Sequence, residues 1–219
     1  MTRRERTWGY SGQVGEWSGD LEVPEERRSP PLAAARYVLE RVRPILEPLH
    51  RPARIEVSWG EYDEAGEELA FHELEEAETT SWDAVDAHLA QLRGAHGTTA
   101  VSCVFVHLDT CVLEAGTETW AERAAELQIS FDAPEVQPVS AQLAYRTSID
   151  VWLGATYDEH RQPRANPDAA SNAPRLEAML HRLREVTADF QAGESQTYPF
   201  AIVATGFREI TVDDLPRRG

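Results

Sequence analysis

The sequence predicts an α+β fold, with a mostly antiparallel or mixed sheet of about five to seven strands and three main helices packed against it. Two observations lead to this prediction. Apolar residues recur with the helical period in three stretches and alternate with polar residues in several others. The connections between these stretches are mostly short, whereas a parallel sheet requires a long crossover between its strands. Apolar residues make up 42% of the 219 residues, which is enough for a substantial core.

The first third of the chain combines a glycine-rich start with a helix and a hairpin. Aromatic residues alternate with glycines over residues 1–24, as in a glycine-broken strand or hairpin, or in a segment that is only partly ordered. A helix is expected from Ser29 to Leu49, because Ser29 suits an N-cap and apolar residues then follow the helical period. Alternating residues over 53–74 indicate a β-hairpin with its turn at 63–66.

The middle of the chain carries signals for one helix and two strands. Thr80 or Ser81 is placed to cap a helix that ends before Gly94. Residues 101–108 are apolar on both faces, which is typical of a central strand covered on both sides. Residues 127–131 alternate and predict a further strand.

The last third is predicted to hold a long strand, a loop and the clearest helix of the chain. Residues 143–153 alternate throughout, as in an extended strand. Residues 158–171 are polar and contain proline, so we expect a loop there. Asn172 is expected to cap the final helix, with Pro174 in its first turn, and residues 198–203 indicate a last strand.

We expect a single α+β domain over residues 30–210, preceded by the glycine- and aromatic-rich segment 1–29 and followed by a flexible tail, residues 211–219. The basic start is not followed by the apolar stretch of a secretory signal. No apolar run approaches the roughly 18–20 residues of a membrane span. Two cysteines, Cys103 and Cys111, are too few for a disulfide framework. The expected location is therefore the cytoplasm.

The chain contains no lysine, since all 21 basic residues are arginine. This excludes a Schiff-base lysine, a phosphate-loop lysine and a lysine general base, and with them pyridoxal enzymes and Walker-type NTPases. Arginine, alanine and glycine are common and asparagine is rare, which is the bias that a GC-rich genome produces. We therefore expect an actinobacterial source.

Acidic residues are concentrated in one block. Residues 55–92 contain twelve acids and no arginine, so this segment carries −12 of the net charge of −17. Such a field repels nucleic acid and anionic membranes, and we expect neither as a partner. It attracts basic proteins. The alternative interpretation is a solvated face that keeps the protein in solution.

No catalytic or cofactor motif stands out, so no catalytic residue is assigned and no cofactor is expected. His107 and Asp109 are two residues apart and would share one face of a strand. His72 of the predicted hairpin is the nearby residue that would join them as a third ligand of a divalent metal. A metal-dependent enzyme built on these three residues remains an alternative.

Two pieces near the C-terminus resemble an uncharacterised actinomycete protein family. They are Asp150-Val151-Trp152-Leu153 and Asn172-Ala173-Pro174-Arg175-Leu176, within a segment that runs from Asp150 to Arg184. The resemblance implies no particular activity and agrees with the expected source. By strand alternation, Asp150 and Trp152 would share one face, opposite Val151 and Leu153.

The leading hypothesis is a non-catalytic acidic module that docks a basic protein, in the form of an immunity protein that blocks a bacterial toxin. The residues expected to bind the partner are Glu61, Asp63, Glu64, Glu67, Glu68, Glu73, Glu75 and Glu76. Besides the metal-dependent enzyme, a third hypothesis is a structural component that forms homo-oligomers through exposed tryptophans. The sequence does not decide the oligomeric state.

Overall fold

The computed structural model describes residues 8–28, 31–62, 68–96, 100–131, 139–157, 163–193 and 200–209. Its helices are α1 (Pro31–Leu46), α2 (Trp82–His96) and α3 (Ala169–Val186), with two short 3-10 turns, η1 (Glu25–Arg27) and η2 (Asp150–Trp152). The long strands are β1 (Tyr10–Glu22), β2 (His50–Tyr62), β3 (Glu68–Glu78), β4 (Ala100–Glu114), β5 (Thr117–Ser130) and β6 (Ser140–Ile149). The short strands are β7 (Ala155–Tyr157), β8 (Pro163–Ala165), β9 (Ala188–Ala192), β10 (Phe200–Val203) and β11 (Gly206–Glu209).

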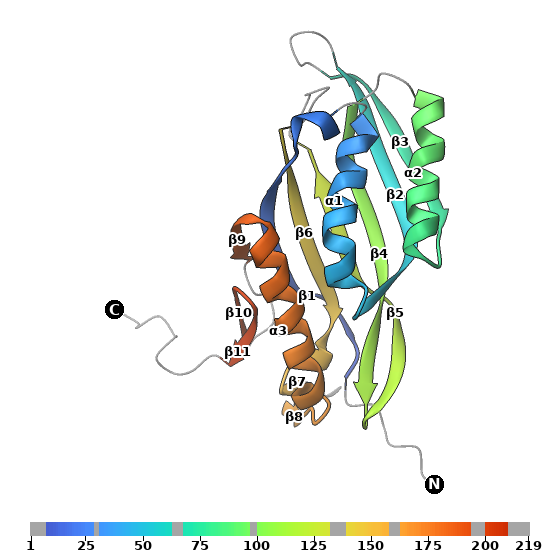
Figure 1. Ribbon diagram of the computed structural model, residues 1–219. Coiled ribbons are helices and arrows are strands. Elements are labelled where there is room, and N and C mark those ends of the chain that lie inside the picture. The colour runs from blue at the N-terminus through green and yellow to red at the C-terminus, as the bar shows by residue number, and fades with distance from the viewer. Residues whose placement is uncertain are drawn as a thin grey trace.

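A seven-stranded sheet organises the fold, with the strand order β3-β2-β4-β5-β6-β1-β9. Every neighbouring pair in it is antiparallel. Figure 1 shows α1, α2 and α3 on the same side of this sheet, and two small hairpins, β7–β8 and β10–β11, complete the described chain. These elements confirm the predicted α+β class, the antiparallel sheet and the three helices. The glycine- and aromatic-rich N-terminal segment contributes β1 to the same sheet, between β6 and β9.

The sheet has one face covered by the helices and one face without them. On the covered face, residues that lie opposite one another across five strands are almost fully buried: Trp17, Tyr145, Leu127, Val106 and Ile55. The prediction that residues 101–108 are covered on both sides is therefore wrong. Val104 and Val106 of β4 are fully buried, whereas Cys103, Phe105 and His107 point to the other face and are half-buried.

The uncovered side is called the open face below. It is defined by the described side chains that share the face of His107: Glu16, Ser18, Asp20 and Glu22 of β1, Arg54 and Glu56 of β2, Glu76 and Glu78 of β3, Cys103, Phe105 and His107 of β4, Glu126, Gln128 and Ser130 of β5, and Gln142, Ala144 and Arg146 of β6. Polar and charged residues dominate this face, as expected for an antiparallel sheet with one solvated side.

The predicted strand 143–153 ends earlier than expected. β6 stops at Ile149, and the next three residues form the 3-10 turn η2, so Asp150 and Trp152 do not share a strand face. The buried side chain of Asn166 donates to the carbonyl of Leu153 at 3.0 Å and to that of Val151 at 3.2 Å. These bonds satisfy carbonyls that a continuing strand would have paired with a neighbour.

The final helix begins five residues before Pro174, and Asn172 does not cap it. The N-cap residue is Asp168, whose carboxylate accepts the backbone N–H of Ala115 at 3.0 Å. Asn172 lies inside the first turns, fully buried, and bonds to the backbone of Leu113 in β4. Pro174 is on the exposed side of the helix, so the carbonyl of Ala170, which proline leaves without an N–H donor, faces solvent.

The predicted cap of α2 is confirmed at residue level. Ser81 caps α2, because its hydroxyl accepts the N–H of Ala84 at 3.2 Å. Gly15 of β1 is required by packing, since a Cβ there would stand 2.6 Å from the Trp17 ring and 2.7 Å from the Phe207 ring. The first half of β5 was not predicted. Its alternation is broken at Arg123, where the backbone takes a positive φ of 46° and the register with β4 shifts.

Candidate functional site

The acidic block of residues 55–92 lies at one edge of the sheet and on the helix that follows it. β3 is the terminal strand and pairs with β2. Three of the predicted partner-binding residues have backbone positions in β2 and β3, namely Glu61, Glu68 and Glu73. Three others lie outside the described residues, namely Asp63, Glu64 and Glu67. Glu75 and Glu76 are the two whose side chains are described.

Glu75 and Glu76 point to opposite sides of the sheet. Glu76 lies opposite Glu56 and belongs to the open face, whereas Glu75 lies opposite the buried Val57 and points to the helix side. The charge of Glu75 acts on His88 of α2, whose pKa is lowered by burial and raised in part by this carboxylate. The block is therefore divided between two surfaces.

Arginines from other parts of the chain neutralise much of the block. Five of its acids form ion pairs with four arginines: Arg36–Asp86, Arg43–Asp83, Arg54–Glu56, Arg54–Glu76 and Arg123–Glu78. Exposed pairs of this kind contribute at most about 1 kcal/mol each to stability, but they cancel charge locally. The described part of the block is thus an alternating surface and not a bare negative one.

A row of charged side chains crosses the open face, and we call it the charge ladder. In order, its members are Glu76, Arg54, Glu56, His107, Glu126, Arg146 and Glu16, from six neighbouring strands. Glu56 Oε1 lies 3.0 Å from both Arg54 Nε and His107 Nε2. On the other side of the imidazole, Nδ1 lies 3.6 Å from Glu126 Oε2. Arg54 and Glu56 lie two residues apart on β2, and the other contacts of the ladder are cross-strand pairs of the kind that stabilises a sheet.

Arg146 holds the second half of the ladder. Its Nε donates to Glu16 and its Nη1 to Glu126, both at 2.8 Å. Burial by itself would lower the pKa of Arg146, but the hydrogen bonds to the two carboxylates outweigh burial and raise it. Gln13 also donates to Glu16 at 2.8 Å. The side chains of Glu16, Glu126 and Arg146 are therefore held in position by hydrogen bonds within the face itself.

A shallow hollow of about 200 Å³ opens beside the ladder. It is lined by Gln13, His107, Arg123, Ala125, Glu126, Arg146, Thr147 and Ser148. The bulge of β5 forms one wall, where Asp109 Oδ1 accepts the N–H of Arg123 at 2.9 Å. A hollow of this size admits one side chain of a partner or a very small molecule.

The three residues of the metal hypothesis do not converge. His107 contacts Glu56 and Glu126, while Asp109 pairs with Arg51 at 3.0 Å. His72 and His107 lie opposite positions of β2 that are five residues apart, which corresponds to roughly 16 Å along the strand. Among the side chains that the structure describes, no group of three or more His, Cys, Asp or Glu is arranged to hold a metal ion.

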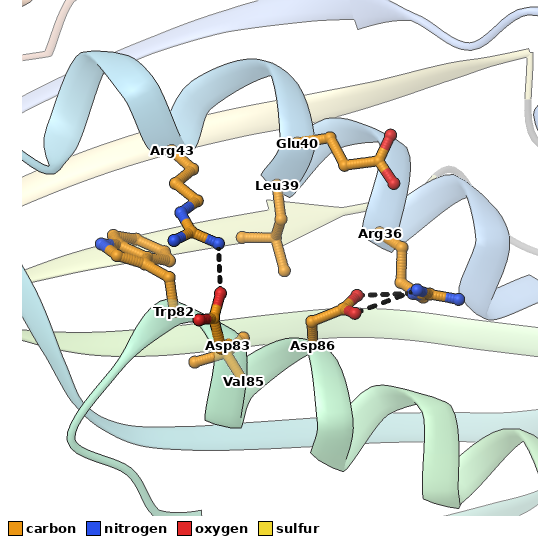
Figure 2. Close-up of a pocket in the computed structure, with 8 residues that line it drawn as sticks. All are labelled: Arg36, Leu39, Glu40, Arg43, Trp82, Asp83, Val85 and Asp86. Atoms are coloured by element: carbon orange, nitrogen blue, oxygen red, sulfur yellow. Dashed lines mark hydrogen bonds and ion pairs between the residues drawn. The ribbon is translucent and has the colours of Figure 1, made fainter.

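A larger hollow of about 300 Å³ lies on the helix side, between α1 and α2. Figure 2 shows its two ends marked by ion pairs, Arg36–Asp86 and Arg43–Asp83, with Leu39 between them. The shortest contacts of these pairs are 2.6 and 2.7 Å. The hydrogen bond to Asp86 raises the pKa of Arg36, so this guanidinium is charged at any ordinary pH. The remaining lining is Glu40, Trp82 and Val85.

A buried polar chain runs through the core, and sequence reasoning missed it. His50 Nδ1 lies 3.1 Å from the Thr110 hydroxyl, and Nε2 lies 3.1 Å from the Tyr145 hydroxyl. Burial lowers the pKa of His50 to about 3 and raises that of Tyr145, so both are neutral. None of the hollows described above is lined by His50. His50 is the first residue of β2, directly after Leu49, and no sequence pattern there indicates a buried, hydrogen-bonded histidine.

The two cysteines are far apart on one strand. They are eight positions apart on β4, which corresponds to about 26 Å, so they cannot form a disulfide with each other. Cys103 is half-buried on the open face near Ser130, and burial raises the pKa of its thiol. Cys111 is the buried one.

Tryptophan exposure bears on the homo-oligomer hypothesis. Five of the six tryptophans are buried: Trp8, Trp17, Trp59, Trp82 and Trp152. Trp120 is 42% exposed, and the Arg51 guanidinium lies 4.3 Å from its ring centroid. An oligomer built on exposed tryptophans would have to use this residue.

No protein-family model, curated protein or solved structure matches the chain. Within the described residues, no helix is long and apolar enough to cross a membrane.

Proposed function

We propose that the protein is a non-catalytic binding module that docks a basic protein on its open face, as an immunity-type inhibitor of a bacterial toxin. One observation carries the proposal. The residues that define the open face include seven carboxylates and two arginines, and Arg123, which pairs with Glu78, adds a third arginine, so the formal charge is −4 with histidine counted as neutral. This charge is spread over the uncovered face of a large sheet, where a partner meets no helix.

The distribution of the charge supports docking better than its total. At the β1 end of the face, Asp20 and Glu22 are exposed. At the β3 end, Glu76 and Glu78 are exposed, and the charge ladder runs between the two ends. A basic partner is attracted by the long-range field and is then oriented by carboxylates in fixed positions. Side chains that are already ordered cost less entropy on binding than free ones.

The neighbouring residues Glu75 and Glu76 offer a matched pair of variants. Glu75→Gln and Glu76→Gln change the net charge equally, but Glu76 is on the open face and Glu75 is on the helix side. We would titrate each with a nona-arginine peptide at low salt. Glu76→Gln should weaken binding about threefold to fivefold, as expected for an exposed charge pair, and Glu75→Gln by less than half of that.

Two results would contradict docking on the open face. Equal weakening by both variants would show that net charge alone attracts the peptide. A larger effect of Glu75→Gln would place the contact on the helix side. The double variant Asp20→Asn and Glu22→Gln should weaken binding again, whereas Glu177→Gln with Glu185→Gln on the exposed side of α3 should not. The immunity role is tested by deleting the gene, which should make the host sensitive to a toxin encoded beside it.

A further inference from the structure

The hollow between α1 and α2 is not part of the open face. The residues that line it belong to α1 and α2. These two helices lie on the other side of the sheet from the open face (Figure 1). Its volume of about 300 Å³ is at the lower end of the range for small-molecule sites. A basic protein docked on the open face would leave this hollow accessible, so it has to be explained separately.

The hollow has an apolar floor. Leu39, Val85 and Trp82 line it and are each between 1% and 7% exposed. The side chain of Leu39 points from α1 toward α2 between the two ion pairs, and Trp82 lies beside Arg43 at one end (Figure 2). A ligand with a short alkyl body would bury apolar surface against these three side chains.

The charges of the lining favour a cation over an anion. Arg36 donates twice to Asp86, at 2.6 and 3.0 Å, and Arg43 donates to Asp83 at 2.7 Å, so the charge of each arginine is already matched. Glu40 is a third carboxylate in the lining, and it forms no short ion pair there: its contact with Arg27 is long, at 3.8 Å, and it acts on Arg36 only through the electrostatic field. With three carboxylates and two arginines the lining carries −1, and the chain as a whole carries −17, which repels anions.

We propose that the hollow between α1 and α2 binds a small organic cation, an alkylguanidinium or alkylammonium, with its alkyl body on Leu39 and Val85 and its charged end at Glu40. Trp82 adds apolar surface at the Arg43 end of the hollow. The two ion pairs limit the length of the site, since they mark its ends along the helices.

The test uses n-butylguanidinium, with n-butanol and n-butyrate as comparison ligands. Amide chemical shifts of the isotope-labelled full chain are followed during each titration. The cation should shift residues 36–43 of α1 and 82–86 of α2 with a dissociation constant on the order of millimolar, as expected for so few atoms. Glu40→Gln should raise that constant about threefold. Glu177→Gln, an equal charge change on the exposed side of α3, should leave it unchanged.

Four outcomes would overturn the proposal. Binding of butanol as tight as that of the cation would leave no role for charge. Tighter binding of butyrate would identify an anion site at Arg36 and Arg43. Equal weakening by Glu40→Gln and Glu177→Gln would indicate the general field of the protein. Shifts that do not saturate, or that spread outside α1 and α2, would mean that there is no site.

Discussion

His50 should limit the stability of the protein at mildly acidic pH. The imidazole is fully buried in the core between Thr110 and Tyr145. Its pKa falls from 6.5 in a solvated chain to about 3 in the folded protein, chiefly because burial disfavours the charged form. Folding therefore requires neutral His50, whereas the unfolded chain takes up a proton below pH 6.5.

The sign and size of the effect follow from this difference. Above pH 6.5 both states are neutral at His50, and its contribution to the free energy of unfolding is complete. The contribution is lost as the pH falls from 6.5 toward 3, because the unfolded state binds more protons. At pH 5 the loss is about 2 kcal/mol, set by a distance of about 1.5 pH units from the unfolded pKa.

The measurement is urea unfolding at pH 7.5 and pH 5.0, for the natural chain and for His50→Gln. Glutamine retains an amide that can bond within the core but cannot take up a proton. Carboxylates titrate in the same range in both proteins, so their effect cancels in the difference. The natural chain should lose about 2 kcal/mol more than the variant between the two pH values. His181→Gln, at an exposed histidine of α3, should behave like the natural chain.

Parallel pH profiles of the natural chain and His50→Gln would refute this reasoning. They would mean that His50 exchanges protons as readily in the folded protein as in the unfolded one. The buried position between Thr110 and Tyr145 would then be wrong, since a solvated imidazole there is incompatible with 1% exposure.

Two further predictions concern stability. Asn172→Ala should reduce the free energy of unfolding by about 2–3 kcal/mol, because it leaves the N–H and C=O of Leu113 without the partners they have at 2.8 and 2.9 Å. Urea unfolding measures this, and a loss below about 0.5 kcal/mol would show that water replaces the amide. Raising sodium chloride from about 20 to 300 mM should raise the melting temperature, because salt screens the repulsion of a chain with net charge −17 more than it weakens exposed ion pairs. A lower melting temperature would show that the ion pairs dominate.

Periodicity predicted the elements well where the alternation or helical stripe is unbroken. The hairpin at 53–74 and the cap at Ser81 are confirmed because both depend on local chemistry. The residues of β4 alone do not predict which of its two faces is covered by helices. Phe105 is apolar but belongs to the open face, where its cross-strand neighbours Glu56 and Gln128 flank it and leave it half-buried. An apolar residue on a strand therefore does not require a helix above it.

The final helix shows how tertiary contacts override a local signal. Asn172 and Pro174 together match the pattern of a helix start, and asparagine is a good N-cap. The structure uses Asn172 instead to bond the backbone of β4, and Asp168 takes the position before the helix. Both interpretations fit the sequence. The choice depends on β4, which is 59 residues away and cannot be placed from the pattern of the helix alone.

The candidate site was out of reach of the sequence for a different reason. Composition counts charges, but the partners of those charges depend on register. Arg146 and Glu16 are 130 residues apart, and Arg36 and Asp86 are 50 apart, yet each forms a direct hydrogen bond. Without the strand order, an acidic block looks unopposed, because the arginines that neutralise it are elsewhere in the chain.

The location of the acid in the sequence and its location in space therefore carry different information. A run of glutamates on a strand alternates between the two faces, so a partner that contacts one face meets only every second residue of the run. For the described residues this leaves Glu76 and Glu78 on the open face, with Glu75 on the helix side. What makes the open face acidic is then not the block alone. β1, near the other end of the sheet, contributes three carboxylates to this face, namely Glu16, Asp20 and Glu22. β2 and β3 together also contribute three, namely Glu56, Glu76 and Glu78. The proposed docking surface is assembled by the sheet from strands far apart in the sequence. A comparison of two adjacent residues on opposite faces therefore tests it more directly than removal of the whole block.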